Sequence, residues 1–207
     1  MEERELRARA GPAHDVDADL IERCRAELPH KTEAYYELLQ KYEKMVYVTC
    51  YRMLGNQQEA EEACQDSFLR VFHKLYQFEG RSTFKTWLFR IVFNFCMTRR
   101  RKLATKRERD HVIGDELHRK TKEIYREASG PGSSDKEYVY QALNRMKDEE
   151  REIITLRFIS DLSLEEMAGV LELKLSATKM RLYRAMDRFK GIYTNKASER
   201  EEALHEK

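Results

Sequence analysis

The sequence predicts an all-α protein of two small helical domains joined by a flexible linker. Glycine and proline are rare, with 8 and 3 residues among 207, or about 5% against a usual share near 12%. Charged residues make up 37% of the chain, and apolar residues recur at steps of three and four, the period of an amphipathic helix. Glycine, serine and proline collect between two such regions, which indicates a domain boundary there.

The N-terminal domain is predicted to span residues 17–109, after a flexible arm at residues 1–16. Its first helix should have Asp15 or Asp17 as its N-cap. The helix should end at Pro29, because the residue before a proline is disfavoured in helical geometry.

Two longer helices should follow and pack face to face as a hairpin. The first has an apolar stripe from Tyr35 to Met53 and stops at Gly55, a residue suited to the left-handed end of a helix. The second begins after Asn56, a favourable N-cap, and its first turns are acidic, which suits the positive end of the helix dipole.

The last helix of this domain combines aromatic and basic residues. It should follow a loop at residues 78–83, with Ser82 or Thr83 as its cap. Between Arg81 and Arg109 there are ten basic residues and one acidic residue. Aromatic rings beside arginine can stack on unpaired bases while the basic run follows phosphates, which indicates a site for opened DNA strands. Most of these rings have core spacing, so the loop and polar positions carry the prediction.

The linker is predicted at residues 110–135, the C-terminal domain at residues 136–193 and a flexible tail at residues 194–207. The tail has almost no apolar residues. Within the C-terminal domain, residues 147–152 are so charged that they are expected to form a turn between two helices.

The end of the C-terminal domain has the pattern of a helix-turn-helix. Ser163 should cap a short helix, and a second, longer helix should bury Thr178, Leu182, Ala185 and Phe189. From Lys174 to Lys190 there are six basic residues and one acidic residue. Such a helix fits the major groove of DNA, where arginine can donate two hydrogen bonds to guanine.

The turn between these two helices departs from the usual glycine. Glu172 stands at that position, and a left-handed conformation would cost a residue other than glycine about 1 kcal/mol. We therefore expect a reshaped turn.

Several classes of protein are disfavoured by what the sequence lacks. It has no apolar run long enough for a membrane span and no signal peptide, so we expect a cytoplasmic protein without membrane insertion. Its four cysteines form no CxxC pair, which predicts reduced, packed thiols and no metal site. No common catalytic or nucleotide-binding motif occurs, so we expect neither an enzyme nor a bound cofactor.

The residues alone leave open a stand-alone helix-turn-helix regulator and a non-specific helical RNA-binding or scaffold protein. Two stretches favour a third interpretation: NQQEAEEACQDSFLRVFHKLYQFEGRSTFKTWLFRIVFNFCMTRRRK, and after the linker MKDEEREIITLRFISDLSLEEMAGVLELKLSATKMRLYRAMDRFK. Together they resemble the extracytoplasmic-function (ECF) class of bacterial sigma factors, the promoter-recognition subunits of RNA polymerase. The resemblance extends roughly over residues 17–192.

The resemblance implies an alternative sigma factor that binds core RNA polymerase, recognises the −35 and −10 elements of promoter DNA and promotes DNA opening. It implies an anti-sigma factor as a further partner, and a linker that threads toward the polymerase active centre. The polymerase-binding residues would be Gln65, Asp66 and Phe68.

The DNA-binding residues are implied in the same way. Those for the −10 element would be Phe78, Glu79, Gly80, Arg81, Ser82, Arg90, Asn94 and Thr98, the last standing where many members have Asp or Asn. Those for the −35 element would be Ser176, Lys179, Arg181, Tyr183 and Arg184, with Arg188 on the same exposed stripe.

Overall fold

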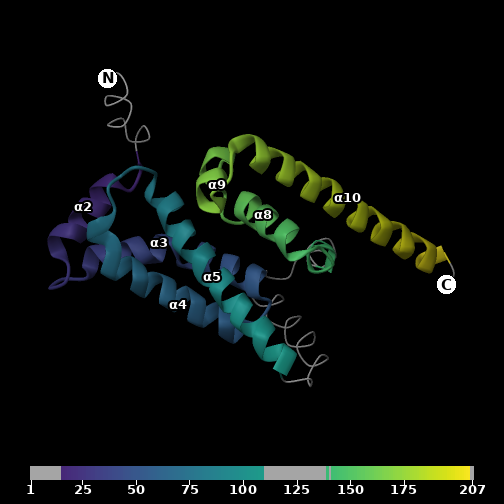
Figure 1. Cartoon of the computed structure of the whole chain (residues 1–207), viewed down its shortest axis with the longest axis horizontal. Coiled ribbons are helices and arrows are strands. Elements are labelled where there is room, and N and C mark those ends of the chain that lie inside the picture. Colours follow the sequence, from purple (N-terminus) through teal and green to yellow (C-terminus); the bar gives the residue numbers. More distant parts are fainter. Residues whose placement is uncertain (1–14, 110–138, 140, 206–207) are drawn as a thin grey trace.

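The structure is a computed structural model that describes residues 15–109, 139 and 141–205 (Figure 1). All regular elements of these residues are helices, so the all-α prediction is confirmed. The predicted linker at residues 110–135 and nearly all of the predicted arm at residues 1–16 lie outside the described residues.

The N-terminal domain is a packed group of helices, as the apolar stripes predict. Asn56 accepts a hydrogen bond from the Glu59 backbone N–H at 3.0 Å, and Gly55 ends the preceding helix with a φ of 69°. Thr83 caps the last helix through the Thr86 N–H at 3.2 Å. The elements are α2 (Ala18–Glu27), α3 (Glu33–Leu54), α4 (Gln57–Lys74), the short 3-10 helix η1 (Leu75–Gln77) and α5 (Phe84–Arg109).

Asp15 and Asp17, which precede α2, connect the start of this helix to α3 and α5. Asp17 stands at the N-cap position but its side chain makes no cap bond. Instead its buried carboxylate accepts hydrogen bonds from Lys41 and Tyr42 of α3. Asp15 accepts from the Asp17 N–H at 3.1 Å and from the Phe84 N–H at 2.7 Å. Asp15 therefore connects the start of α2 to the start of α5.

The C-terminal domain contains helical residues 141–144, then α8 (Asp148–Phe158), α9 (Leu164–Leu171) and α10 (Leu175–His205). The prediction of a charged turn at residues 147–152 was wrong, because α8 begins at Asp148. Its first turn holds Asp148, Glu149 and Glu150. Carboxylates in that position stabilise a helix through its dipole, so charge here marks a helix start.

Most of the segment that was predicted as a flexible tail, from residue 194 on, is helical in the structure. Helix α10 continues to His205 and projects beyond the other helices (Figure 1). Residues 196–204 are mostly Ala, Glu, Lys, Arg and Leu, which have high helix propensity. Helix propensity thus extends α10 past the residues that pack on the core.

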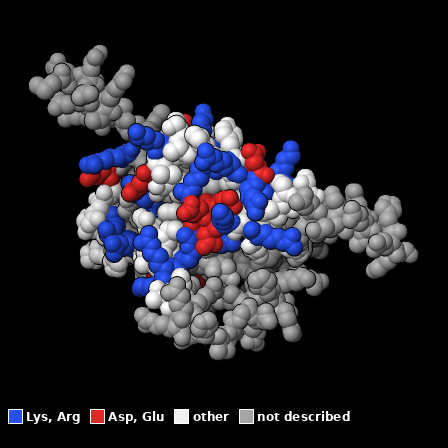
Figure 2. All heavy atoms as spheres, turned by 45° about the vertical axis from the view of Figure 1, so that its right-hand side comes forward, with Lys and Arg blue, Asp and Glu red and all other residues white. Residues whose placement is uncertain are grey.

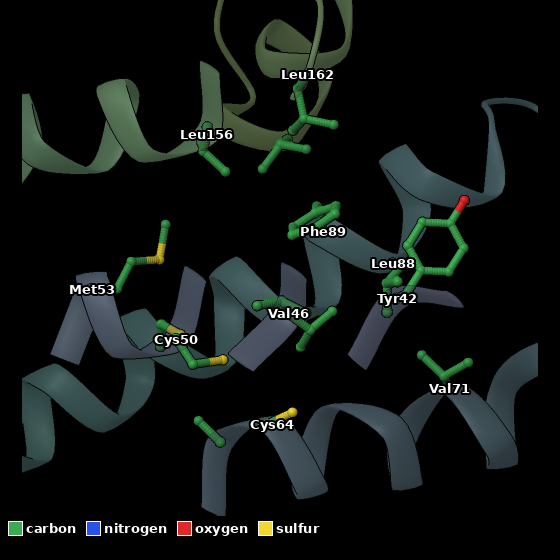
Figure 3. Close-up of a cluster of buried hydrophobic side chains, with 14 of the residues drawn as sticks. Tyr42, Val46, Cys50, Met53, Cys64, Val71, Leu88, Phe89, Leu156 and Leu162 are labelled. Atoms are coloured by element: carbon green, nitrogen blue, oxygen red, sulfur yellow. The ribbon is translucent and has the colours of Figure 1, made fainter. Parts of the chain in front are cut away.

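The two domains pack directly against each other. Helix α5 contacts α9, and α3 contacts α8. Figure 3 shows Leu156 and Leu162 of the C-terminal domain facing Phe89 of α5 across one apolar layer. All three side chains are fully buried. The two helices that were predicted to bind DNA, α5 and α10, therefore belong to domains that share a common apolar core.

The four cysteines are free and buried, as the sequence predicted. Burial raises the pKa of Cys24 to about 11 and that of Cys64 to about 12. A hydrogen bond with Cys96, together with burial, raises the pKa of Cys50 well above its usual value. The thiolate, which is the reactive form of cysteine, is therefore scarce at neutral pH.

We predict that the folded protein reacts slowly with a thiol reagent at pH 7. The four thiols should react at least about tenfold faster in urea, because unfolding exposes all of them and restores the ordinary pKa of Cys24, Cys50 and Cys64. Counting labelled cysteines by mass spectrometry over time measures this. Complete labelling of any one cysteine at the unfolded rate would contradict the packing role.

Candidate nucleic-acid interface

The basic face of α10 lies opposite its buried stripe. Thr178, Leu182 and Ala185 are buried, and Phe189 is partly buried against the core, as predicted. The residues predicted to read the −35 element are exposed, with one exception; the exposed ones are Ser176, Lys179, Tyr183, Arg184 and Arg188.

The exception is Arg181, which points toward α8. Its guanidinium lies 3.6 Å from Glu149 and 3.7 Å from Glu152, and its side chain is 31% exposed. Glu152 is buried, and burial raises its pKa although Arg100 and Arg181 act against this. Arg181 thus joins α10 to α8 in this arrangement.

The turn before α10 keeps the left-handed geometry of a helix-turn-helix. Glu172 has a φ of 56°, so the expected reshaping of the turn was wrong. Ser163 and Glu166 form a capping box at the start of α9, which confirms Ser163 as the cap. The carboxylate of Glu172 lies 2.7 Å from the guanidinium of Arg90.

Three residues predicted for the −10 element form one exposed stripe on α5. Arg90, Asn94 and Thr98 follow at steps of four residues and are all exposed. Asn94 and Thr98 also line a cavity of about 440 Å³ between α4 and α5. An amide at the rim of such a cavity can donate to and accept from the edge of an unpaired base.

The same cavity brings in residues that the sequence did not single out. Basic and amide side chains come from the end of α4 and from η1, and aromatic rings come from α5. This combination can hold a phosphate and stack on a base at once. The polar residues are Arg70, Lys74 and Gln77, and the rings are those of Trp87 and Phe95. The steps of three and four between the polar residues were the sequence signal that could have placed them on one face.

The loop at residues 78–83 divides into an anchor and an exposed tip. Phe78, which was predicted to contact DNA, is only 6% exposed, so its side chain belongs to the core in this structure. Its ring packs on Trp87 at 5.3 Å, while the Arg25 guanidinium lies over the ring and donates to the Phe78 carbonyl. Phe78 therefore anchors the loop to Trp87 of α5 and Arg25 of α2.

The tip of this loop presents charge to solvent. Glu79 and Arg81 form an ion pair with side chains 61% and 84% exposed. Gly80 has a φ of 69°, a conformation that favours glycine. Ser82 follows at half-buried depth. Glu79 and Arg81 are therefore exposed and Gly80 and Ser82 half-buried, in contrast to the buried Phe78.

The predicted polymerase-binding residues on α4 also differ in their exposure to solvent. Gln65 is exposed and Asp66 is half-buried, whereas Phe68 is 8% exposed and belongs to the core. The Tyr35 hydroxyl donates to the Phe68 carbonyl at 2.6 Å. Leu69, 59% exposed, is the apolar side chain that this surface offers instead.

The acidic first turns of α4 are already paired within the domain. The Arg99 guanidinium lies 2.7 Å from Glu59, 2.8 Å from Glu62 and 3.3 Å from Asp66. Hydrogen bonds from Arg99 lower the pKa of Glu62. Arg99, one residue of the basic run of α5, therefore neutralises acidic residues of α4. Both segments present less unpaired charge than the sequence suggests.

Charge of both signs covers the face that Figure 2 presents, with Lys and Arg spread around a compact group of Asp and Glu. Within the described ranges, no helix is long and apolar enough to cross a membrane.

Comparisons with known proteins agree with this arrangement. Residues 38–106 match sigma-70 region 2 and residues 136–189 match sigma-70 region 4, together more than half of the chain. The protein is 29% identical over 161 residues to the ECF RNA polymerase sigma factor SigW of Bacillus subtilis, covering 75% of this chain and 86% of SigW. It is 30% identical over 169 residues to the ECF sigma factor SigE of Mycolicibacterium smegmatis, covering 79% and 63% of the two chains.

Two solved structures share the fold at 22% identity. CnrH in complex with the cytosolic domain of CnrY has a TM-score of 0.62, covering 87% of this chain and 99% of that one. The sigma factor RpoE of Bartonella quintana, in complex with the anti-sigma factor NepR, has a TM-score of 0.63, covering 77% and 96%. The chain belongs to the sigma-70 family of RNA polymerase sigma factors, in its ECF class.

Proposed function

We propose that the protein is an alternative sigma factor that binds core RNA polymerase and directs it to promoters with particular −35 and −10 elements. The observation that carries this is the pairing, on one chain, of an exposed basic recognition helix with a separate base-capture surface. The first is the outer face of α10, and the second is the stripe of Arg90, Asn94 and Thr98 beside the cavity of α4 and α5.

Each surface has its own task in this proposal. On α10, Arg184 and Lys179 read or follow duplex DNA at the −35 element, since arginine and lysine donate to guanine and phosphate in the major groove. On α5, Asn94 contacts a base that has left the duplex. Only an unpaired base can enter this site, so the free energy of binding that base favours the opened form of the DNA.

Specificity arises when both surfaces act together. Each alone is a modest DNA-binding site, but a polymerase that holds them at a fixed spacing makes the second contact effectively intramolecular. The exposed end of the α4 surface, with Gln65 and Leu69, is the proposed contact with polymerase, together with Asp66 once it leaves Arg99.

An anti-sigma factor is the proposed regulatory partner. Of the two structures with this fold, one is the sigma factor RpoE bound to the anti-sigma factor NepR, and the other is CnrH bound to the cytosolic domain of CnrY. The same kind of partner would cover the polymerase-binding surface of this chain.

Binding experiments with and without core polymerase test the proposal. The purified protein should co-elute with core RNA polymerase, and the complex should retard promoter DNA that the free protein binds only weakly. Tight, sequence-specific binding by the free protein, without any association with polymerase, would instead identify a stand-alone helix-turn-helix regulator.

A further inference from the structure

The loop at residues 78–83 is held at both ends by residues that form or precede α2. At its start, the Cζ atom of Arg25 lies 5.9 Å from the centre of the Phe78 ring, and the guanidinium donates to the Phe78 carbonyl. At its end, Asp15 accepts a hydrogen bond of 2.7 Å from the N–H of Phe84, the first residue of α5. The two supports stand 53 and 69 residues before the residues that they hold.

Helix α2 is itself fixed to the rest of the domain. Ile21 and Cys24 on its inner face are buried. At its end, the carboxylate of Glu27 accepts a hydrogen bond of 3.0 Å from the N–H of Ala34 on α3. The helix also contacts η1, the turn that leads into the loop. A side chain on such an anchored helix can hold a binding surface in place, because its own position is locked by packing.

The contact made by Arg25 continues through two aromatic rings to the cavity between α4 and α5. The ring centres of Phe78 and Trp87 are 5.3 Å apart, and each lies 5.9 Å from that of Phe84. Trp87 lines the cavity of about 440 Å³ together with Asn94. Arg25 is not among the described residues that line it. A shift of Phe78 would therefore move a ring of the cavity wall, and Arg25 can act on a bound base only through these rings.

We propose that Arg25 is a positioning residue for the base-capture surface of α5, and that Asp15 holds the other end of the same loop. The proposal rests on the proposed function only in assigning the −10 element as the DNA bound there. In this role α2 does not touch DNA but fixes the loop and the ring of Trp87 in the arrangement that accepts an unpaired base. A preorganised surface does not have to be ordered when the base arrives, and this increases affinity.

The free protein provides the first test, because Trp87 is the only tryptophan of the chain. Arg25→Ala should shift its emission to longer wavelength and increase its quenching by acrylamide, since a loosened Phe78 ring exposes Trp87 to water. Arg23→Ala is the matched control. It removes the same charge from the same helix, at an exposed arginine that pairs with Glu37, and should leave emission and quenching unchanged.

The second test measures base capture by the complete holoenzyme. One single-stranded oligonucleotide carries the intact −10 element, others carry an abasic site at one position each, and their dissociation constants are measured by fluorescence anisotropy. At the captured position, the unchanged protein should bind the intact strand about 5- to 150-fold more tightly, the range for stacking of one base. Arg25→Ala and Asp15→Ala should each lower this ratio at least about threefold. Arg25→Lys keeps a donor and the charge, so it should lower the ratio less.

Discrimination between matched and altered −35 elements should stay unchanged in these variants, whereas a general loss of folding would reduce it as well. Equal ratios for Arg25→Ala and Arg23→Ala would overturn the positioning role, whatever the fluorescence shows. A lowered ratio with unchanged emission and quenching would also overturn it, because Arg25 would then contact DNA itself. Failure of the proposed function would look different, since the unchanged protein and every variant would then fail to bind core polymerase.

Discussion

Replacing Asn94 with alanine should slow promoter opening about 5- to 150-fold, the range expected when a base contact of about 1–3 kcal/mol is lost. Asn94 is exposed on α5 and lines the cavity that receives the base in our proposal. Alanine keeps the helix but removes the amide. The rate is measured with a fluorescent base in the −10 element, after mixing holoenzyme with duplex promoter.

Asn94→Ala should slow the opening step and leave the initial binding of duplex promoter unchanged. On a promoter melted in advance over the −10 element, the variant should recover most of its activity, because the binding energy of the captured base is no longer needed to open the duplex. Gln40→Ala is the matched control, because Gln40 is an exposed amide on α3, away from this cavity. Equal opening rates for Asn94→Ala and Gln40→Ala would show that the base is held elsewhere.

Arg184→Ala should reduce transcription from promoters that depend on the −35 element by a similar factor, about 5- to 150-fold for the loss of a bidentate base contact. Arg184 is exposed on the outer face of α10, one turn beyond Met180. Run-off transcription with a matched and an altered −35 element measures the effect. The variant should lose the difference between the two templates, because the contact that distinguishes them is gone.

Two further variants separate base reading from charge. Arg184→Lys keeps the positive charge but loses the planar pair of donors, so it should retain non-specific binding and lose sequence preference. Arg23→Ala removes an exposed arginine of α2 that pairs with Glu37, and should leave transcription unchanged. If Arg184→Ala and Asn94→Ala both preserve promoter output, the assigned sites are wrong.

The helices could be predicted from sequence because their signals are local. Apolar spacing defined α3 and α4, and Gly55 and Asn56 mark the boundary between them through their own backbone and side-chain chemistry. The same spacing places Phe68 with Cys64 and Val71 in the core. The family resemblance placed Phe68 among the polymerase-binding residues, whereas the helical period alone indicates its buried position.

Contacts between distant segments had no local signal. Arg99 appears as part of a basic run, yet it binds three carboxylates of α4 that stand at least 33 residues earlier. Glu172 appears as a misfit in its turn until its partner Arg90, 82 residues away, is known. Phe89 fits the core of either domain, and only the packed fold shows that it joins both.

The direct measurement of promoter choice is transcription by core RNA polymerase with this protein on a pool of random promoter sequences, with every start site mapped. A sigma factor predicts that the active templates share one −35 element and one −10 element at a fixed spacing, and that omitting the protein abolishes them. Start sites without a shared pair of elements, or the same sites with core polymerase alone, would contradict it.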